Sequence, residues 1–153
     1  MSAPAGKHYT VLIVDDNPEL LTLITESLTL LGDYTVLTAE DGALGLERAV
    51  ELRPDCLVID IKMPGLDGYQ LVRAVRGDPA TASIPLVMLT ALPQEKYRLA
   101  GLLVGADQHL TKPTKPADLV AAIQAAIDLS VAERARRMDG LAREASEDPH
   151  ENT

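Results

Sequence analysis

Short apolar runs alternate with longer amphipathic stretches along most of this chain, and no other feature constrains its fold as strongly. The runs have the length of strands, and several are apolar at consecutive positions, which is typical of strands covered on both faces. They occupy residues 11–14, 34–38, 56–59, 84–89 and 108–110. Because strands that alternate with helices favour parallel pairing and right-handed crossovers, we expect an α/β fold, a three-layer α/β/α sandwich of five βα units.

The stretches between the runs contain helix signals. Pro18 suits a first helical turn with Asn17 as its N-cap, and Gly32 ends that helix. Apolar residues at helical spacing predict further helices over 42–52, from Gly68, over 93–104 and from Pro116 onward. In the helix over 42–52 the residues expected to face inward are Leu44, Leu46, Ala49 and Val50.

Composition narrows the class of protein. The 153 residues, 46% of them hydrophobic, suffice for one domain with its own core and a modest extension. A formal net charge of −9 argues against nucleic acid as a direct partner, because a phosphate backbone requires clustered Lys and Arg. The single cysteine, Cys56, fits a reducing cytoplasm. No apolar run approaches the roughly 20 residues of a membrane span, so we expect a cytoplasmic protein that does not contact membranes.

Polar residues follow four of the five apolar runs, at the points where strands would end. Asp15 and Asp16 follow the first run, Asp60 the third, Thr90 the fourth and Lys112 the fifth. Ligands of open α/β sheets bind beyond the carboxyl ends of the strands, so these side chains should meet in one crevice. Crowded carboxylates repel one another unless a cation lies between them, and such oxygen ligands favour Mg²⁺.

A carboxylate in a magnesium site can act as a nucleophile toward phosphorus and form an acyl phosphate. Asp60 is the expected nucleophile because it is single and central, whereas Asp15 and Asp16 are paired for metal binding. Lys112 would neutralise charge on the phosphoryl oxygens, and Thr90 would donate a hydrogen bond to one of them. The sequence therefore predicts a site for phosphoryl transfer.

At these residues the chain resembles the receiver domains of two-component response regulators, which occur in bacterial signalling. The motifs that are similar lie at 11–17, 57–68, 87–91 and 105–113, within a resemblance that spans about residues 8–130. The resemblance implies a flavodoxin-like sheet in the strand order 2-1-3-4-5, which is the order of a chemotaxis receiver. It also implies that Asp60 accepts a phosphoryl group from the phosphohistidine of a sensor histidine kinase or a histidine phosphotransfer protein.

The resemblance implies further roles in the pocket. Asp16 would bind Mg²⁺ directly, Asp15 would bind it through water, and Asp60 would be a further ligand. The backbone carbonyl of Lys62 would complete the protein ligands. The peptide bond between Lys112 and Pro113 is expected to be cis. Three residues flank the pocket and would tune the access of water to the acyl phosphate: they are Lys62, Ala91 and Leu92. Because Leu92 is bulky, we expect slow self-dephosphorylation.

Thr90 and His109 are the implied switch residues. Thr90 would move toward the phosphoryl group, and His109 would fill the space that it leaves. This movement would repack the helix over 93–104, the strand over 108–110 and the helix from Pro116, which form the expected output face. The family usually has Tyr or Phe where this chain has His109. Two interpretations stay open, a rotating ring that titrates near neutral pH and an ordinary exposed ring on a short edge strand.

We expect a flexible N-terminus over 1–8, a receiver domain over 9–130 that acts alone as a signalling phosphoacceptor rather than an enzyme, and no output domain. An alternative is a phosphorelay shuttle that passes the phosphate to a histidine phosphotransfer domain. A more distant alternative is a Mg²⁺-dependent phosphohydrolase, which would need a second acid–base Asp where this chain has Lys62.

Residues 131–153 are expected to form a helical extension and a disordered tail. Apolar residues recur there at steps of four and three, a heptad-like spacing that Gly140 interrupts: Val131, Ala135, Met138, Ala142 and Ala145. The alternative is a helix that docks on a partner or forms a homodimer. The sequence names neither the kinase nor the downstream protein.

Overall fold

A computed structural model describes residues 8–61, 67–90, 105–129 and 136. Over these ranges the elements in chain order are β1 (Tyr9–Val14), α1 (Pro18–Leu31), β2 (Tyr34–Ala39), α2 (Gly42–Leu52), β3 (Cys56–Asp60), α3 (Gly68–Gly77), β4 (Leu86–Thr90), β5 (Gln108–Thr111) and α5 (Pro116–Asp128). All neighbouring strands pair in parallel, in the order β2-β1-β3-β4-β5. The expected strand order is therefore confirmed, whereas the helix expected over 93–104 lies outside the described residues.

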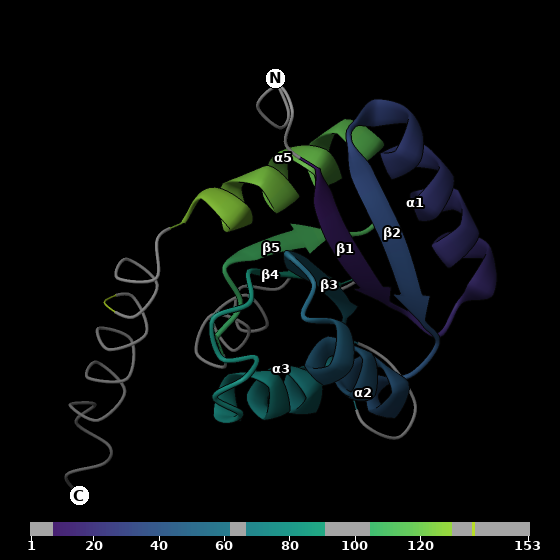
Figure 1. Ribbon diagram of the computed structural model, residues 1–153. Coiled ribbons are helices and arrows are strands. Elements are labelled where there is room, and N and C mark those ends of the chain that lie inside the picture. The colour runs from purple at the N-terminus through teal and green to yellow at the C-terminus, as the bar shows by residue number, and fades with distance from the viewer. Residues whose placement is uncertain (1–7, 62–66, 91–104, 130–135, 137–153) are drawn as a thin grey trace, which may run out of the picture.

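Different helices cover the two faces of the sheet (Figure 1). On one face, Val11, Ile13 and Val58 of the strands pack with buried residues of α1 and α5. On the other face, neighbouring strand residues such as Leu12 and Ile59 pack with residues of α2 and α3. Because consecutive residues of β1, β3 and β4 alternate between two cores, these strands are apolar on both sides. The three-layer α/β/α sandwich is confirmed.

Side-chain caps determine where the first three helices begin. The Asn17 side chain accepts hydrogen bonds from the backbone N–H groups of Glu19 and Leu20, as expected for an N-cap. Asp41 caps α2 in the same way, and Asp67 forms a capping box with Gln70 at the start of α3. None of the helices in the described ranges combines the length and the apolarity that a membrane crossing requires.

Two local predictions need correction. Val50 was expected to face inward, but it is exposed, because α2 approaches β1 through Gly45, where a Cβ would lie 2.8 Å from Val14 Cγ2. The fourth strand was expected from residue 84, but β4 begins at Leu86. The N–H of Ile84 instead donates to the carbonyl of Thr81 at 3.1 Å, and Pro85 has no N–H to contribute.

Tyr34 buries its hydroxyl at the start of β2 without a hydrogen-bond partner among the described residues. Burial raises its pKa, with a further contribution from Cys56. A pKa that is higher in the folded chain gives stability that is present below about pH 10 and is lost as the pH rises through the folded-state value. Tyr34→Phe should therefore leave stability at pH 7 unchanged or raise it by about 1 kcal/mol, and should weaken its decline at alkaline pH.

Urea unfolding at pH 7 and above pH 10 measures both effects. Tyr9→Phe is the matched control, because Tyr9 packs its ring near that of Tyr34 with centroids 6.4 Å apart but is only partly buried. A clear loss of stability at pH 7 in Tyr34→Phe alone would show that the hydroxyl makes a favourable contact.

Candidate functional site

The carboxyl ends of four strands meet at one edge of the sheet and position the predicted polar residues. Asp15 follows β1, Asp60 ends β3, Thr90 ends β4 and Lys112 follows β5. The Lys112 N–H donates to the carbonyl of Thr90 at 2.6 Å, which holds the end of β5 beside β4. Parallel pairing in this order therefore gathers residues that are up to 97 positions apart in sequence.

Lys112 bridges two buried carboxylates. Its Nζ lies 3.1 Å from Asp15 Oδ2 and 3.2 Å from Asp60 Oδ1, and these aspartates are 1% and 6% exposed. Burial acts to lower the pKa of Lys112, but the hydrogen bond to Asp15 and the charge of Asp60 outweigh it, so the pKa is raised. The lysine is therefore positively charged at neutral pH and offsets part of the repulsion between the two aspartates.

The three predicted acidic residues form one cluster. Asp15, Asp16 and Asp60 each offer a carboxylate oxygen, and these oxygens lie within 4.8 Å of one another. Asp16 is exposed, so that one side of the cluster is open to solvent. This donor set fits Mg²⁺, which prefers oxygen ligands and usually keeps several waters. When bound, the ion would supply positive charge next to an incoming phosphoryl group.

Replacement of Lys112 tests the electrostatics of the cluster. Lys112→Met should bind Mg²⁺ several-fold more tightly than the unsubstituted chain, because it removes a positive charge that competes with the cation for Asp15 and Asp60. Isothermal titration with MgCl₂ measures the affinity. Lys115→Met is the matched control, because Lys115 is exposed and its replacement removes the same charge at a position outside the cluster. Unchanged or weaker binding in Lys112→Met would contradict this account.

Gly68 allows α3 to begin directly against the end of β3. Its N–H donates to the carbonyl of Ile61 at 2.9 Å, and a Cβ would lie only 2.5 Å from the carbonyl oxygen of Asp60. Gly68→Ala should therefore displace the backbone at the candidate phosphoacceptor and cost about 1–3 kcal/mol of stability. Chemical denaturation measures this loss against Gly77→Ala, since a Cβ at Gly77 meets no atom within 4 Å. Equal stability of the two variants would show that the contact relaxes freely.

Thr90 and His109 lie on adjacent strands and on the same face of the sheet. Thr90 is buried and pairs in register with Thr111. Two residues earlier along both strands, Met88 of β4 pairs with His109 of β5. Met88 belongs to the core under α2 and α3, whereas Leu110 packs against the core on the opposite face. Side chains alternate along a strand, so His109 points to the Met88 face, and its ring is half-buried.

The remaining predicted residues divide into two groups. The Lys112–Pro113 peptide bond is cis, as expected. The carbonyl ligand and the tuning residues lie outside the described ranges: they are Lys62, Ala91 and Leu92.

A buried ion pair near the amino-terminal ends of β4 and β5 was not predicted. The Arg76 side chain donates to Asp107 Oδ2 at 3.1 Å, and Asp107 also accepts the N–H of Leu86 at 2.8 Å. Arg76 further donates to the carbonyls of Gly105, Ala82 and Ile84, at 3.0, 3.0 and 2.5 Å. It therefore ties the end of α3 to the entrances of β4 and β5. Asp107 lies in the motif over 105–113 that resembles receiver domains, which was the one sequence signal for this residue. Nothing in that motif indicates that its partner is an arginine on α3.

A doubly wound sheet with three acidic residues, a threonine and a lysine at its carboxyl edge defines a class of protein, the receiver domain. The family model described as response regulator receiver domain matches residues 11–124. This chain belongs to that family, whose members are signalling phosphoacceptors.

Similarity to individual proteins agrees with the family. The DNA-binding dual master transcriptional regulator RpaA of Synechocystis sp. is 39% identical over 115 residues, which are 75% of this chain and 47% of that protein. The chain thus spans about half the length of the curated relatives that it matches.

Two solved structures match the fold closely. Chemotaxis protein CheY4 of Vibrio cholerae is 33% identical with a TM-score of 0.72, over 77% of this chain and 98% of that one. The receiver domain of sensor histidine kinase PA1611 from Pseudomonas aeruginosa, solved with a magnesium ion in its active site cleft, is also 33% identical. Its TM-score is 0.72, over 79% of this chain and 98% of that one.

Proposed function

We propose that Asp60 of this chain accepts a phosphoryl group in a Mg²⁺-dependent reaction and thereby switches contacts with a partner protein. One observation supports the proposal above all others: Lys112 Nζ lies within hydrogen-bonding distance of both Asp15 and Asp60, which are buried. A charge-paired, buried aspartate beside a candidate metal site is equipped to react and to retain a labile product.

The donor is the phosphohistidine of a sensor histidine kinase or of a histidine phosphotransfer protein. A carboxylate oxygen of Asp60 attacks phosphorus, the P–N bond breaks, and the leaving imidazole nitrogen takes up a proton. Lys112 and Asp60 are already 3.2 Å apart, so the ammonium group can stabilise charge that develops on the phosphoryl oxygens. Asp15, Asp16 and Asp60 would hold the Mg²⁺ ion together with the carbonyl of Lys62.

The acyl phosphate adds about −1.5 to −2 charges and three acceptor oxygens at the edge of the sheet. Thr90 would donate a hydrogen bond to this group, and His109 would respond on the neighbouring strand. Both side chains lie on one face, which supports a shared movement. The output surface would then include β5 and α5, together with residues 93–104.

The receiver over residues 9–130 is proposed to act through protein contacts in the cytoplasm. The relative RpaA is described as DNA-binding, so the expectation that this chain does not bind nucleic acid stays a prediction. The net charge of −9 supports that prediction for the chain itself.

Labelling with a small phosphodonor tests the function. Acetyl phosphate with MgCl₂ should add one phosphoryl group to the intact chain, as seen by mass spectrometry, and EDTA should prevent the addition. Hydroxylamine should remove the group, because it cleaves acyl phosphates and leaves phosphate esters intact. A product stable to hydroxylamine, or labelling that is indifferent to EDTA, would contradict the proposal. Continuous release of inorganic phosphate at a high rate would instead favour the phosphohydrolase.

A further inference from the structure

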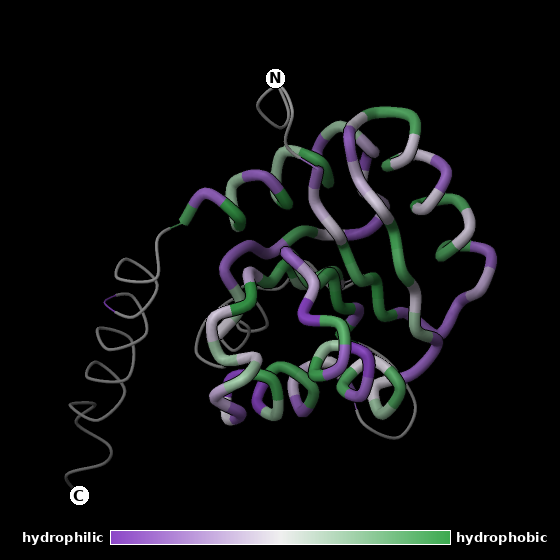
Figure 2. The backbone as a smooth tube through the Cα atoms, in the orientation of Figure 1, coloured by the Kyte–Doolittle hydropathy of each residue, from purple (hydrophilic) through white to green (hydrophobic). Residues whose placement is uncertain are grey.

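A groove of about 430 Å³ runs between α1 and the edge strand β2. Its apolar lining includes Leu21, which is buried, and Val36, which is partly buried, so apolar side chains form its deeper part. Figure 2 shows the middle of β2 as hydrophobic and the segment that follows the strand as hydrophilic. The polar lining consists of three threonines and two glutamates: Thr22, Thr25, Thr38, Glu26 and Glu40.

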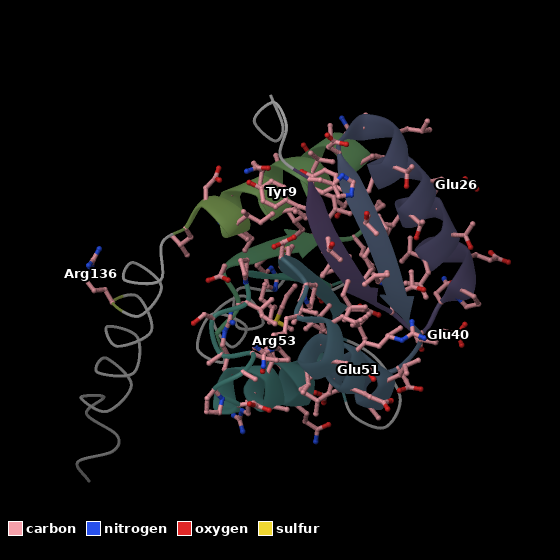
Figure 3. All side chains as sticks on the ribbon, in the orientation of Figure 1. Tyr9, Glu26, Glu40, Glu51, Arg53 and Arg136 are labelled. Carbon is pink, nitrogen blue, oxygen red and sulfur yellow. The ribbon has the colours of Figure 1, made fainter. Side chains whose placement is uncertain are left out.

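The polar groups that α1 presents to this groove accept hydrogen bonds and do not donate them. Thr22 and Thr25 each donate the hydroxyl hydrogen to the carbonyl four residues earlier, at 3.0 and 2.7 Å, so that only the oxygen lone pairs stay available. Carboxylates are also acceptors only. Figure 3 shows Glu26 on α1 and Glu40 below it, beyond the end of β2. Among the described residues, neither glutamate is in a salt bridge.

This lining suits a cationic side chain. The ammonium of lysine and the guanidinium of arginine carry several N–H donors and no acceptor, which complements a set of acceptors. Their aliphatic stems can lie along apolar surface while the charged end reaches polar groups. The groove therefore matches both parts of a lysine or an arginine.

A metal ion matches the groove less well. The three aspartates of the candidate magnesium site place carboxylate oxygens within 4.8 Å of one another. Glu26 and Glu40 belong to no such group of three or more ligands in the described ranges. A compact ion requires ligands that converge on one point, whereas a side chain spreads its contacts along its length.

The groove borders backbone groups that no described strand pairs with. β2 lies at the edge of the sheet beside α1, and its neighbour is β1 (Figure 1). The carbonyls of Asp33 and Ala39 accept N–H groups from the β1 side, both at 3.1 Å. Backbone groups of successive residues point to opposite sides of a strand. The residues that point theirs away from the sheet are therefore the even-numbered ones: Tyr34, Val36 and Thr38.

Arg48 agrees with this direction, since it donates from α2 to the carbonyl of Thr38. The open part of the edge is therefore centred on Val36, whose side chain lines the groove. A chain that paired with β2 would place alternate side chains on the same face as Val36, next to α1. Backbone pairing at the edge and occupancy of the groove thus fit one and the same ligand.

We propose that this site binds an extended basic peptide, which adds a strand to the edge of β2 and inserts one arginine or lysine side chain between α1 and β2. In such binding the backbone hydrogen bonds give affinity, and the side-chain pocket gives specificity. The net charge of −9 favours association with a basic partner and disfavours an anionic one. Neither Asp60 nor Lys112 takes part, so this binding goes beyond the proposed phosphoryl transfer and does not depend on it.

Fluorescence anisotropy with a synthetic peptide tests the site on the full chain. The labelled probe has about six residues, a common strand length, with one arginine among valines and threonines. We expect saturable binding that weakens about fivefold in Glu26→Gln, which removes one carboxylate from the groove. Glu51→Gln is the matched control, because Glu51 is exposed on α2 and outside the groove (Figure 3). The control should bind the probe like the unsubstituted chain.

Changes to the probe separate the two parts of the contact. Citrulline, a neutral urea of nearly the same shape as arginine, should weaken binding to the unsubstituted chain more than binding to Glu26→Gln. N-methylation of one alternate set of peptide amides should abolish binding, whereas methylation of the other set should not. In amide exchange followed by NMR, the probe should slow the N–H of Val36 and leave that of Leu37, which faces β1, unchanged.

Equal affinity of Glu26→Gln and Glu51→Gln would overturn the proposal, because the attraction would then be one of net charge alone. Binding that survives both patterns of N-methylation would overturn it too, as would the absence of saturable binding at millimolar peptide. A dimer in sedimentation experiments whose Val36 amide is protected without peptide would assign the edge to a second copy of the chain, and this result would also overturn the proposal.

Discussion

Asp60→Asn is expected to abolish phosphoryl labelling of this chain by acetyl phosphate. The amide keeps the size and shape of the side chain but lacks the anionic oxygen that attacks phosphorus. It also removes one charge from a cluster in which Lys112 pairs with both Asp15 and Asp60. The variant should therefore fold and retain the Lys112–Asp15 contact, while labelling falls by at least 100-fold, a change of about 2.7 kcal/mol or more in activation free energy.

Intact-protein mass spectrometry after a timed reaction measures the loss. Asp55→Asn is the matched control, since Asp55 immediately precedes β3 at the other edge of the sheet and accepts the N–H of Thr10 at 2.8 Å. The control should label like the unsubstituted chain. Should Asp60→Asn label to the same extent at another carboxylate, the assignment of the phosphoacceptor would be wrong.

Arg76→Met is expected to lower the free energy of unfolding by about 3–5 kcal/mol, the cost of leaving one partner of a buried ion pair without the other. The side chains of Arg76 and Asp107 are 9% and 1% exposed. Removal of the guanidinium leaves the Asp107 carboxylate buried beside an apolar side chain. It also withdraws donors from the carbonyls of Gly105, Ala82 and Ile84. The largest losses should fall at the entrances of β4 and β5.

Urea denaturation at pH 7 measures the change, with Arg73→Met as the control because Arg73 is exposed on the same helix. The control should stay within about 0.5 kcal/mol of the parent. The double variant Arg76→Met/Asp107→Leu should recover part of the loss, since it buries no unpaired charge. A single variant as stable as Arg73→Met would mean that water replaces the guanidinium at little cost.

The candidate site could be predicted because its residues follow from strand periodicity. A parallel sheet places the carboxyl ends of its strands at one edge, so Asp15, Asp60, Thr90 and Lys112 are placed together by their positions after apolar runs. Local helix signals were also readable, as Asn17 and its cap show. The strand order, by contrast, came from resemblance to a family, because apolar runs alone do not say which strands are neighbours.

Contacts that depend on close approach could not be predicted. Val50 has the helical spacing of an inward residue, but Gly45 packs on Val14 and leaves Val50 exposed. Arg76 meets Asp107 across 31 residues of sequence. That meeting requires Gly105 at φ 110°, where an added Cβ would lie 2.8 Å from Arg76 Cγ. No periodic pattern reports such a contact.

The sequence by itself determined which residues lie at the carboxyl ends of the strands, since strand length, alternation and polar strand ends are local properties of the chain. Only the tertiary structure decided how those residues meet. Lys112 bridges Asp15 and Asp60 because β3 lies between β1 and β4, and β5 is held beside β4. The apolar groove between α1 and the start of α5 is likewise a product of packing, since two helices that are distant in sequence form its walls.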